Sequence, residues 1–362
     1  MLRLLRPKTD LRTLITLLAV ASIVITLANS LYAAWRVQRE ILITNTLEAN
    51  RVYAAKLAAI TGQFFQQAQS QLAWTADAIG EHFDDEALLQ TEVDRLRKQT
   101  NSFNSVLIVD ADGWVKAISP ESLMLKGMQL HTDSAREALS RRTALIGQPS
   151  LSAANNLMVF ISRPVWSASG RYLGYIGGTV YLKRKSILNE LLLSQFYRDG
   201  TQLYVLDRDN RVLYHHNSQL IGRKIAPLLH QDKASYASSG CQEIRNERGE
   251  PALAGYAHVP DSDWTIFVLK QTRFTLAPLS SLLFQVIQRS LPLALLTLAA
   301  AWLLARLIAL PLWQLARKAS QMDAQDAAVE INGIRSWYFE SSQIKRALLS
   351  GIGLMQSKIG QL

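Results

Sequence analysis

Two long apolar runs are the strongest pattern in the chain. Residues 14–35 contain no charged side chain, and residues 282–305 contain a single charged side chain, that of Arg289. A helix of about 20 apolar residues spans the hydrocarbon core of a bilayer, so both runs are predicted to be transmembrane helices. Basic side chains cluster in residues 1–13 and again after residue 305. The positive-inside rule then predicts that both termini are cytoplasmic and that residues 36–281 lie across the membrane.

Each apolar run has an alternative interpretation. The first could be a cleaved signal peptide, but its length and the poor small-x-small site Ala33-Ala34-Trp35 favour a retained anchor. The second could be a buried core helix, because only 16 residues separate Arg289 from Arg306. Long arginine stems reach the membrane interface, and the basic residues beyond Arg306 favour a span.

Between the apolar runs, residues 36–82 have the pattern of one long helix. Apolar side chains recur at spacings of three and four, and no proline occurs between Pro7 and Pro120. We expect a stalk that ends near Gly80. The apolar face could pack on a domain, form a dimer seam, or do both.

A short pattern then appears twice. Residues 106–119 and 203–214 each contain a β-rich run, an Asp-x-Asp-Gly/Asn turn and a second β-rich run, and Asp110 and Asp207 lie 97 residues apart. Glycine and asparagine tolerate the positive φ of tight turns, so each copy is predicted to be a β-hairpin. Gly113 comes two residues too early for an EF-hand calcium loop. The repeat indicates two related modules in tandem.

The modules are predicted to be α+β and PAS-like. The distal module, residues 100–185, adds a short helix capped by Thr132 or Asp133 and strands at 156–162 and 174–182. A helical bridge leads to the proximal module, residues 200–275, whose further strands lie near 242–244, 252–258 and 264–269.

The last segment, residues 306–362, is predicted to be a signalling linker. One helix starts at Pro311, a connector covers residues 323–333, and a second helix runs from 340 to 362. Its apolar residues have the 4-3-4-3 spacing of a coiled-coil seam, namely Leu348, Ile352, Met355, Ile359 and Leu362. Gly351, Gly353 and Gly360 weaken that helix.

The order of the motifs resembles a double Cache (dCache) extracytoplasmic sensor over residues 37–280. The motifs are Val-Asp-x-Asp-Gly, Leu-Lys-Gly, Ser-Arg163-Pro-Val, Gly-Tyr-Ile-Gly-Gly, Tyr-x-Leu-Asp, Ile-Gly-Arg-Lys and Asp263-Trp264. The helix, connector and helix of the C-terminal segment resemble a HAMP-type relay. The run 334–340, with Lys345-Arg-Ala-Leu-Leu349 after it, resembles the segment before the catalytic GGDEF domain of dCache-containing diguanylate cyclases.

This resemblance implies a homodimeric receptor of the bacterial inner membrane that senses a periplasmic small molecule. Its output would be cyclic di-GMP, made by a diguanylate cyclase domain after Leu362, and Mg and GTP would be needed only there. A chemoreceptor or histidine kinase would have the same sensor. A membrane-anchored periplasmic enzyme is a third possibility.

Composition narrows these alternatives. The net charge is +10. Residues 1–13 carry four basic against one acidic side chain and residues 306–362 seven against four, so +6 of it flanks the apolar runs. No basic stripe is interleaved with aromatics, so we expect no nucleic-acid partner. One cysteine, Cys241, excludes an internal disulfide and is predicted to lie in a loop.

No catalytic motif or metal site is predicted. His215 and His216 are adjacent, so in a strand they point to opposite faces and cannot share a metal. In dCache proteins the ligand usually binds in the distal module, and the candidate contacts here are Asp133, Arg136, Asn156, Arg163, Trp166 and Tyr181. Arg163 could clamp a carboxylate or pair with Asp133. The family's amino-acid-binding run, Arg-x-Trp-Tyr on a helix, is absent, which argues against amino-acid sensing.

Overall fold

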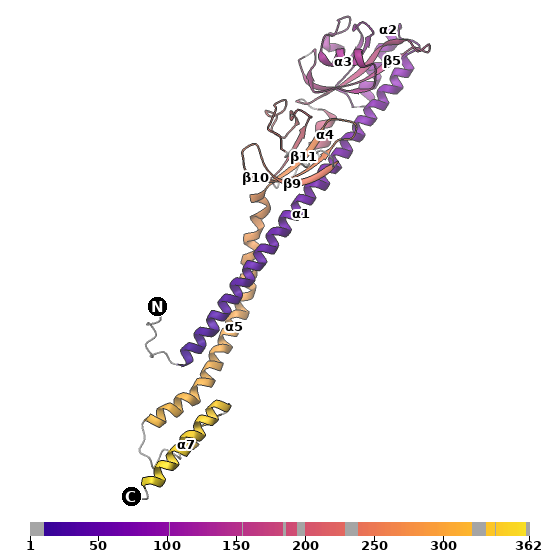
Figure 1. Cartoon of the computed structure of the whole chain (residues 1–362). Coiled ribbons are helices and arrows are strands. Elements are labelled where there is room, and N and C mark those ends of the chain that lie inside the picture. The colour runs from indigo at the N-terminus through magenta and orange to yellow at the C-terminus, as the bar shows by residue number, and fades with distance from the viewer. Residues whose placement is uncertain are drawn as a thin grey trace. The chain divides into compact units, whose positions relative to one another are not determined.

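A computed structural model describes residues 11–100, 102–153, 155–183, 186–193, 200–228, 238–320, 331–336 and 338–359 (Figure 1). The chain forms two compact units. One unit is Arg39–Pro278, and the other combines Met1–Gln38 with Leu279–Leu362. The first unit contains every strand of the described residues.

Helix α1, Leu11–Ile79, is the longest element. From Ala54 onward its buried positions form one stripe that includes Leu57, Phe65 and Leu72, each at most 1% exposed. The helix ends one residue before Gly80, as predicted. A Cβ at Gly80 would collide with the Trp166 carbonyl oxygen, so the absent side chain lets the helix end meet the sheet.

The distal sheet is antiparallel, with strand order β2-β1-β6-β5-β3 and with β4 on β5. Its elements in chain order are α2 Glu86–Thr100, β1 Ser105–Asp110, β2 Val115–Ser119, η1 Glu121–Leu123, α3 Asp133–Arg141, β3 Leu145–Ile146, β4 Ser150–Leu151, β5 Leu157–Trp166 and β6 Tyr172–Tyr181. The short helix α3 was predicted, and Thr132 caps it. Helix α2 and strands β3 and β4 were not predicted.

The proximal sheet repeats this topology, with strand order β8-β7-β11-β10-β9. Its elements are α4 Ile187–Leu193, β7 Thr201–Leu206, β8 Val212–Tyr214, β9 Ser239–Arg245, β10 Pro251–His258 and β11 Thr265–Gln271. Each sheet begins with the predicted hairpin at its edge. The α+β class and the tandem repeat are therefore confirmed. Cys241 lies in strand β9 opposite Gly255, so its predicted place in a loop was wrong.

The two hairpins share their turn chemistry. Asp110 Oδ1 accepts backbone hydrogen bonds from Asp112 at 3.0 Å and Trp114 at 2.9 Å. Asp207 Oδ1 accepts the matching bonds from Asp209 at 2.9 Å and Arg211 at 2.8 Å. A carboxylate that satisfies the backbone donors of its own turn has a structural role, which is the role that the sequence predicted.

Both modules pack on α1. Their apolar cores join α1 residues such as Leu57 and Leu72 to Ile161 of the distal sheet and Ile266 of the proximal sheet. Strand β10 approaches the helix so closely that a Cβ at Gly255 would collide with the α1 backbone.

The second unit contains the two candidate membrane segments and the C-terminal helix. Helices covering Thr13–Ile79 and Thr272–Arg317 are long and apolar enough to cross a membrane, by length and composition. The second is part of α5, Thr272–Ser320, which continues through Pro311, so a helix start at that residue was wrong.

Helix α7, Phe339–Ile359, packs on the end of α5 within this unit. Leu348 and Ile352 of the predicted seam contact a small cluster made of Leu315, Ile331 and Ile334. Lys345 Nζ donates to the carbonyl oxygens of Asn332 and Ile334 at 2.8 and 2.9 Å. Leu362, Gly360, residues 321–330 of the connector and the side chains of Met355 and Ile359 lie outside the described structure.

Candidate ligand-binding cavity

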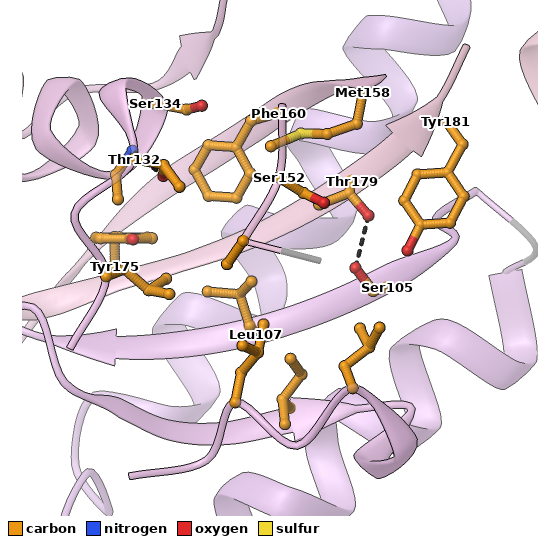
Figure 2. A pocket seen from close by; sticks show the side chains of 16 residues that line it. Ser105, Leu107, Thr132, Ser134, Ser152, Met158, Phe160, Tyr175, Thr179 and Tyr181 are labelled. Carbon is orange, nitrogen blue, oxygen red and sulfur yellow. Dashed lines mark hydrogen bonds between the residues drawn. The ribbon is translucent and has the colours of Figure 1, made fainter. Parts of the chain in front are cut away.

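A cavity of about 40 Å³ lies in the distal module, on the face of the sheet that points away from α1 (Figure 2). Strands β1, β5 and β6 form its floor, and α3 and the segment before it cover the other side. Leu123, Leu125 and Leu130 line the cover. The cavity therefore lies between the sheet and the helix, where the sequence placed the ligand.

Alternation along β5 decides which side chains reach the cavity. Met158 and Phe160 line it, whereas Val159 and Ile161 belong to the core shared with α1. Side chains two residues apart share a face of a strand, so Arg163 lies on the α1 side with Val159 and Ile161. Its side chain therefore faces away from the cavity.

Strand β6 contributes the polar groups of the floor by the same alternation. Tyr175, Thr179 and Tyr181 line the cavity from one face of this strand. Thr179 Oγ1 and Ser105 Oγ are 2.6 Å apart, which pairs two hydroxyls across β6 and β1 (Figure 2). The sequence pattern Tyr-x-Gly-x-Thr-x-Tyr gave the signal for this face, but our prediction included only Tyr181.

Tyr175 is the most deeply buried polar residue of the cavity. It is 1% exposed, and its ring lies edge-on to Phe160 with 5.8 Å between centroids. Burial raises the pKa of its phenol, so the group stays protonated. Within the described part of the chain its Oη has no hydrogen-bond partner. A buried hydroxyl without a partner is costly, so this group calls for an explanation.

The helix side of the cavity uses its hydroxyls differently. Thr132 Oγ1 accepts a hydrogen bond from the Ala135 amide at 3.3 Å and so caps α3. Ser134 Oγ and Ser150 Oγ are 2.6 Å apart. These contacts hold α3 over the sheet. Among the fully buried hydroxyls of the described side chains that line the cavity, that of Tyr175 has no hydrogen-bond partner in the protein.

The charged candidates lie outside the cavity. Asp133 and Arg136 form an ion pair of 2.7 Å on the solvent side of α3, with side chains 88% and 69% exposed. Asn156 closes a turn, where its backbone amide donates a hydrogen bond to Ser152 Oγ at 3.1 Å. Trp166 is 44% exposed and packs edge-on to Tyr172. Of the six predicted residues, the structure brings only Tyr181 to the cavity.

The proximal sheet has larger side chains where the distal sheet has this floor. The strand registers match Leu107 with Tyr204, Gly177 with Phe267 and Thr179 with Leu269. Tyr204, Phe267 and Leu269 are buried together in an apolar cluster. At the positions equivalent to the hydroxyl pair of Ser105 and Thr179, the proximal sheet has Gln202 opposite Leu269. Within the described part of the proximal module, the matching face therefore carries a cluster of large buried side chains.

The described residues hold no group of three metal-ligating side chains. His215 and His216 follow strand β8, and their ring centroids are 4.0 Å apart, so the expectation that they point to opposite faces of a strand was wrong. His215 Nδ1 accepts a hydrogen bond from the backbone amide of Asn217 at 3.0 Å. Burial, followed by the charge of His216, lowers the pKa of His215 to about 4. The pair therefore behaves as neutral packing at pH 7.

The comparison with known families agrees with this architecture. A family model for the Cache domain, dCache_1, matches residues 36–279. The chain belongs to the Cache domain family. The dCache resemblance of the sequence is thus confirmed, and the distal cavity is a feature of a Cache domain.

Solved structures with this fold share little sequence with the chain. The extracellular domain of a protein described as a histidine kinase, rpHK1S-Z16, has a TM-score of 0.53 at 19% identity, and the match covers 64% of this chain and 96% of that one. The ligand-binding domain of the Pseudomonas aeruginosa PAO1 amino-acid chemoreceptor PctC, solved with GABA, has a TM-score of 0.51 at 18% identity and covers 62% and 100%.

A match to a longer protein is the extracellular ligand binding receptor from Desulfohalobium retbaense DSM5692. It has a TM-score of 0.46 at 14% identity, and the match covers 64% of this chain but only 40% of that protein. No curated protein sequence matches the chain. At these identities the likeness concerns the fold of the Cache domain.

Proposed function

We propose that this chain is the sensor and transmembrane part of a bacterial inner-membrane receptor. A periplasmic small molecule binds in the distal module, and the signal passes through the membrane helices to a cytoplasmic output. The cavity carries this proposal, because the distal sheet leaves room for a small ligand, whereas the described residues on the matching face of the proximal sheet are large and buried. The related sensor domain of PctC was solved with a small molecule, GABA, which supports the same use of the fold.

The proposed topology has both termini in the cytoplasm and residues 36–281 in the periplasm, between spans at 14–35 and 282–305. The support is the charge asymmetry around two apolar helices. The test labels intact cells with a membrane-impermeant maleimide after Asp209→Cys or Asp326→Cys in a Cys241→Ser background. We expect labelling at position 209 only. Labelling at position 326 without labelling at 209 would refute the topology.

The output side is proposed to be a homodimeric HAMP-like relay over residues 306–362, with its seam on α7. A diguanylate cyclase domain is our first candidate for the output, from the sequence around residues 334–349. A chemoreceptor or histidine kinase output fits the fold equally well, because solved sensors of both kinds share it. Sequencing the gene beyond the codon for Leu362 would distinguish these outputs.

Filling the cavity tests the sensor function. Ala135 lines the cavity from α3 and is 2% exposed. A diguanylate cyclase domain fused after Leu362 would report the signal as cyclic di-GMP in cells that receive a small-molecule extract. We expect Ala135→Trp to abolish the response to the extract. Ser140→Trp places the same side chain on the exposed side of α3 and should leave the response intact.

A retained response in Ala135→Trp, with normal membrane levels of the protein, would show that the distal cavity is not the sensory site. A milder variant, Ala135→Leu, guards against misfolding. It should weaken the response in proportion to the volume that it fills. If Ala135→Leu and Ser140→Trp behave alike, the cavity has no role in sensing.

A further inference from the structure

We infer that the ligand of the distal cavity is a small, uncharged molecule with an apolar body and one hydrogen-bond acceptor, which the Tyr175 hydroxyl engages. This inference rests on the proposed function, because it assumes that the cavity is the sensory site. It excludes zwitterionic amino acids as ligands of this cavity. Three features of the cavity support this inference. They are the uncharged lining, the protonated and unpartnered hydroxyl of Tyr175, and the small volume.

No charged side chain lines the cavity among the described residues. Asp133 and Arg136 lie next to lining residues of α3, but they form an ion pair with each other and are exposed to solvent. Arg163 shares the opposite face of its strand with Val159 and Ile161. Moving an ammonium or carboxylate group from water into such a site costs far more than one hydroxyl contact returns. A charged ligand is therefore disfavoured.

Tyr175 supplies the polar contact. Tyr175 lines the cavity, and its buried Oη has no partner within the described structure, whereas Ser105 Oγ and Thr179 Oγ1 lie 2.6 Å from each other. Because burial raises its pKa, the phenol keeps its proton and acts as a donor. A carbonyl or ether oxygen on the ligand would satisfy it. The rest of the ligand would contact apolar side chains such as Leu107, Met158 and Phe160.

The size of the cavity sets the scale of the ligand. Its volume is about 40 Å³. A single water needs roughly 10–15 Å³, and a dry cavity of about 150 Å³ accepts benzene. The space therefore suits a molecule of only a few heavy atoms, in contact with leucine side chains of the cover that can rotate. A three-carbon probe is an appropriate starting size.

The test compares four probes that share a three-carbon skeleton and differ in charge. They are propionamide, which is neutral, propionate, propylammonium and L-alanine. Saturation-transfer difference NMR on the full chain in lipid nanodiscs at pH 7 reports binding. We expect a signal from propionamide that disappears in Ala135→Trp and persists in Ser140→Trp. We expect the three charged probes to give no signal that Ala135→Trp removes.

A second variant tests the hydroxyl itself. Tyr175→Phe keeps the ring and removes only Oη, and loss of one hydrogen bond should raise the propionamide dissociation constant about tenfold. The melting temperature without probe should not fall, since the variant removes an unpartnered buried group. A merely structural tyrosine would give the reverse pattern, a lower melting temperature and unchanged binding.

Two results would overturn the inference. One is a charged probe whose signal Ala135→Trp abolishes, and the other is the absence of such a signal from propionamide at 20 mM, on the order of the weakest binding that the method detects. The fusion reporter separates these from failure of the proposed function. If Ala135→Trp still abolishes the response to the extract, the cavity is sensory and only the ligand class is wrong. If the response survives, the proposed function itself fails.

Discussion

Replacing Gly255 with alanine tests how closely α1 is held against the proximal sheet. A Cβ at this position would lie inside contact distance of the backbone atoms of Asn50 and Arg51. Backbone atoms cannot rotate away as a side chain can. Helix and strand must therefore separate by on the order of 1 Å, because carbon atoms pack at about 3.5–4.0 Å.

This separation also breaks a buried hydrogen bond. Asn50 Nδ2 donates to the Leu253 carbonyl oxygen at 2.9 Å, and Asn50 is 7% exposed. A separation of about 1 Å more would lengthen this hydrogen bond beyond the usual upper limit of about 3.2 Å. Overpacking costs about 1–3 kcal/mol, and an unpaired buried group costs about 1–3 kcal/mol more. We therefore expect the contact between α1 and β10 to lose about 2–6 kcal/mol.

Hydrogen–deuterium exchange of the full chain in nanodiscs would measure this loss locally. Peptides covering residues 43–58 and 251–258 should exchange at least about 30-fold faster, which corresponds to about 2 kcal/mol. Peptides from β1 and β6 report on the distal sheet and should change less. Unchanged deuterium uptake over residues 43–58 would refute the reasoning, because the helix would then not be held by this close approach.

Gly353→Ala is the matched control. The same methyl group is added to a glycine, but no heavy atom lies within 4 Å of the new Cβ. Alanine should stabilise α7 by up to about 1 kcal/mol through helix propensity. We therefore expect slower exchange in α7 and no change in residues 43–58. Faster exchange in both variants would point to a general effect of the substitution instead.

The other predictions concern a histidine, the single thiol and the relay. His215 has a pKa of about 4 when folded, below the ordinary histidine value of 6.5, so its contribution to folding stability is complete above about pH 6.5 and is lost as the pH falls toward 4. Denaturant unfolding should show on the order of 1–2 kcal/mol of this loss, and His215→Gln should remove it. Cys241 is exposed, and Cys241→Ser should leave the proposed dimer intact in cross-linking, whereas loss of the dimer would indicate a bridge. Gly351→Ala, Gly353→Ala and Gly360→Ala together should add on the order of 3 kcal/mol of helix propensity per chain and reduce the stimulus ratio of the cyclase fusion. An unchanged ratio would show that the glycines are incidental.

Local chemistry explains the parts of the fold that the sequence predicted. The Asp-x-Asp turns satisfy their own backbone donors at Asp110 and Asp207, so the hairpins depend on neighbouring residues alone. The cap of α3 at Thr132 is equally local. Helix α2 was missed although Leu89, Val93 and Leu96 follow helical spacing and are buried. Its apolar stripe is short and interrupted by charge.

The cavity was harder to predict because it depends on which face of each strand is covered. Three of the six candidates, Asp133, Arg136 and Arg163, are charged, and all three lie outside the cavity. Alternation along β5 would have excluded Arg163, since Val159 and Ile161 share its face. The cover formed by the segment before α3 is a long-range contact. No local pattern in that segment indicates which sheet face it covers.

The two modules show how one scaffold can serve two roles along a single helix. Both sheets pack on α1, and Gly80 and Gly255 let the backbone of each module approach it without a side chain between them. In the distal module the face away from α1 holds the cavity, whereas in the proximal module Tyr204 and Phe267 fill that face. A ligand can shift such a system only if it binds one arrangement of the distal sheet better than another. Since Ile161 and Val159 stand on the α1 side of the strand that carries Met158 and Phe160, any change in that strand reaches the packing of α1 directly. The proximal module gives the helix a second attachment, through the core that joins Ile266 to α1.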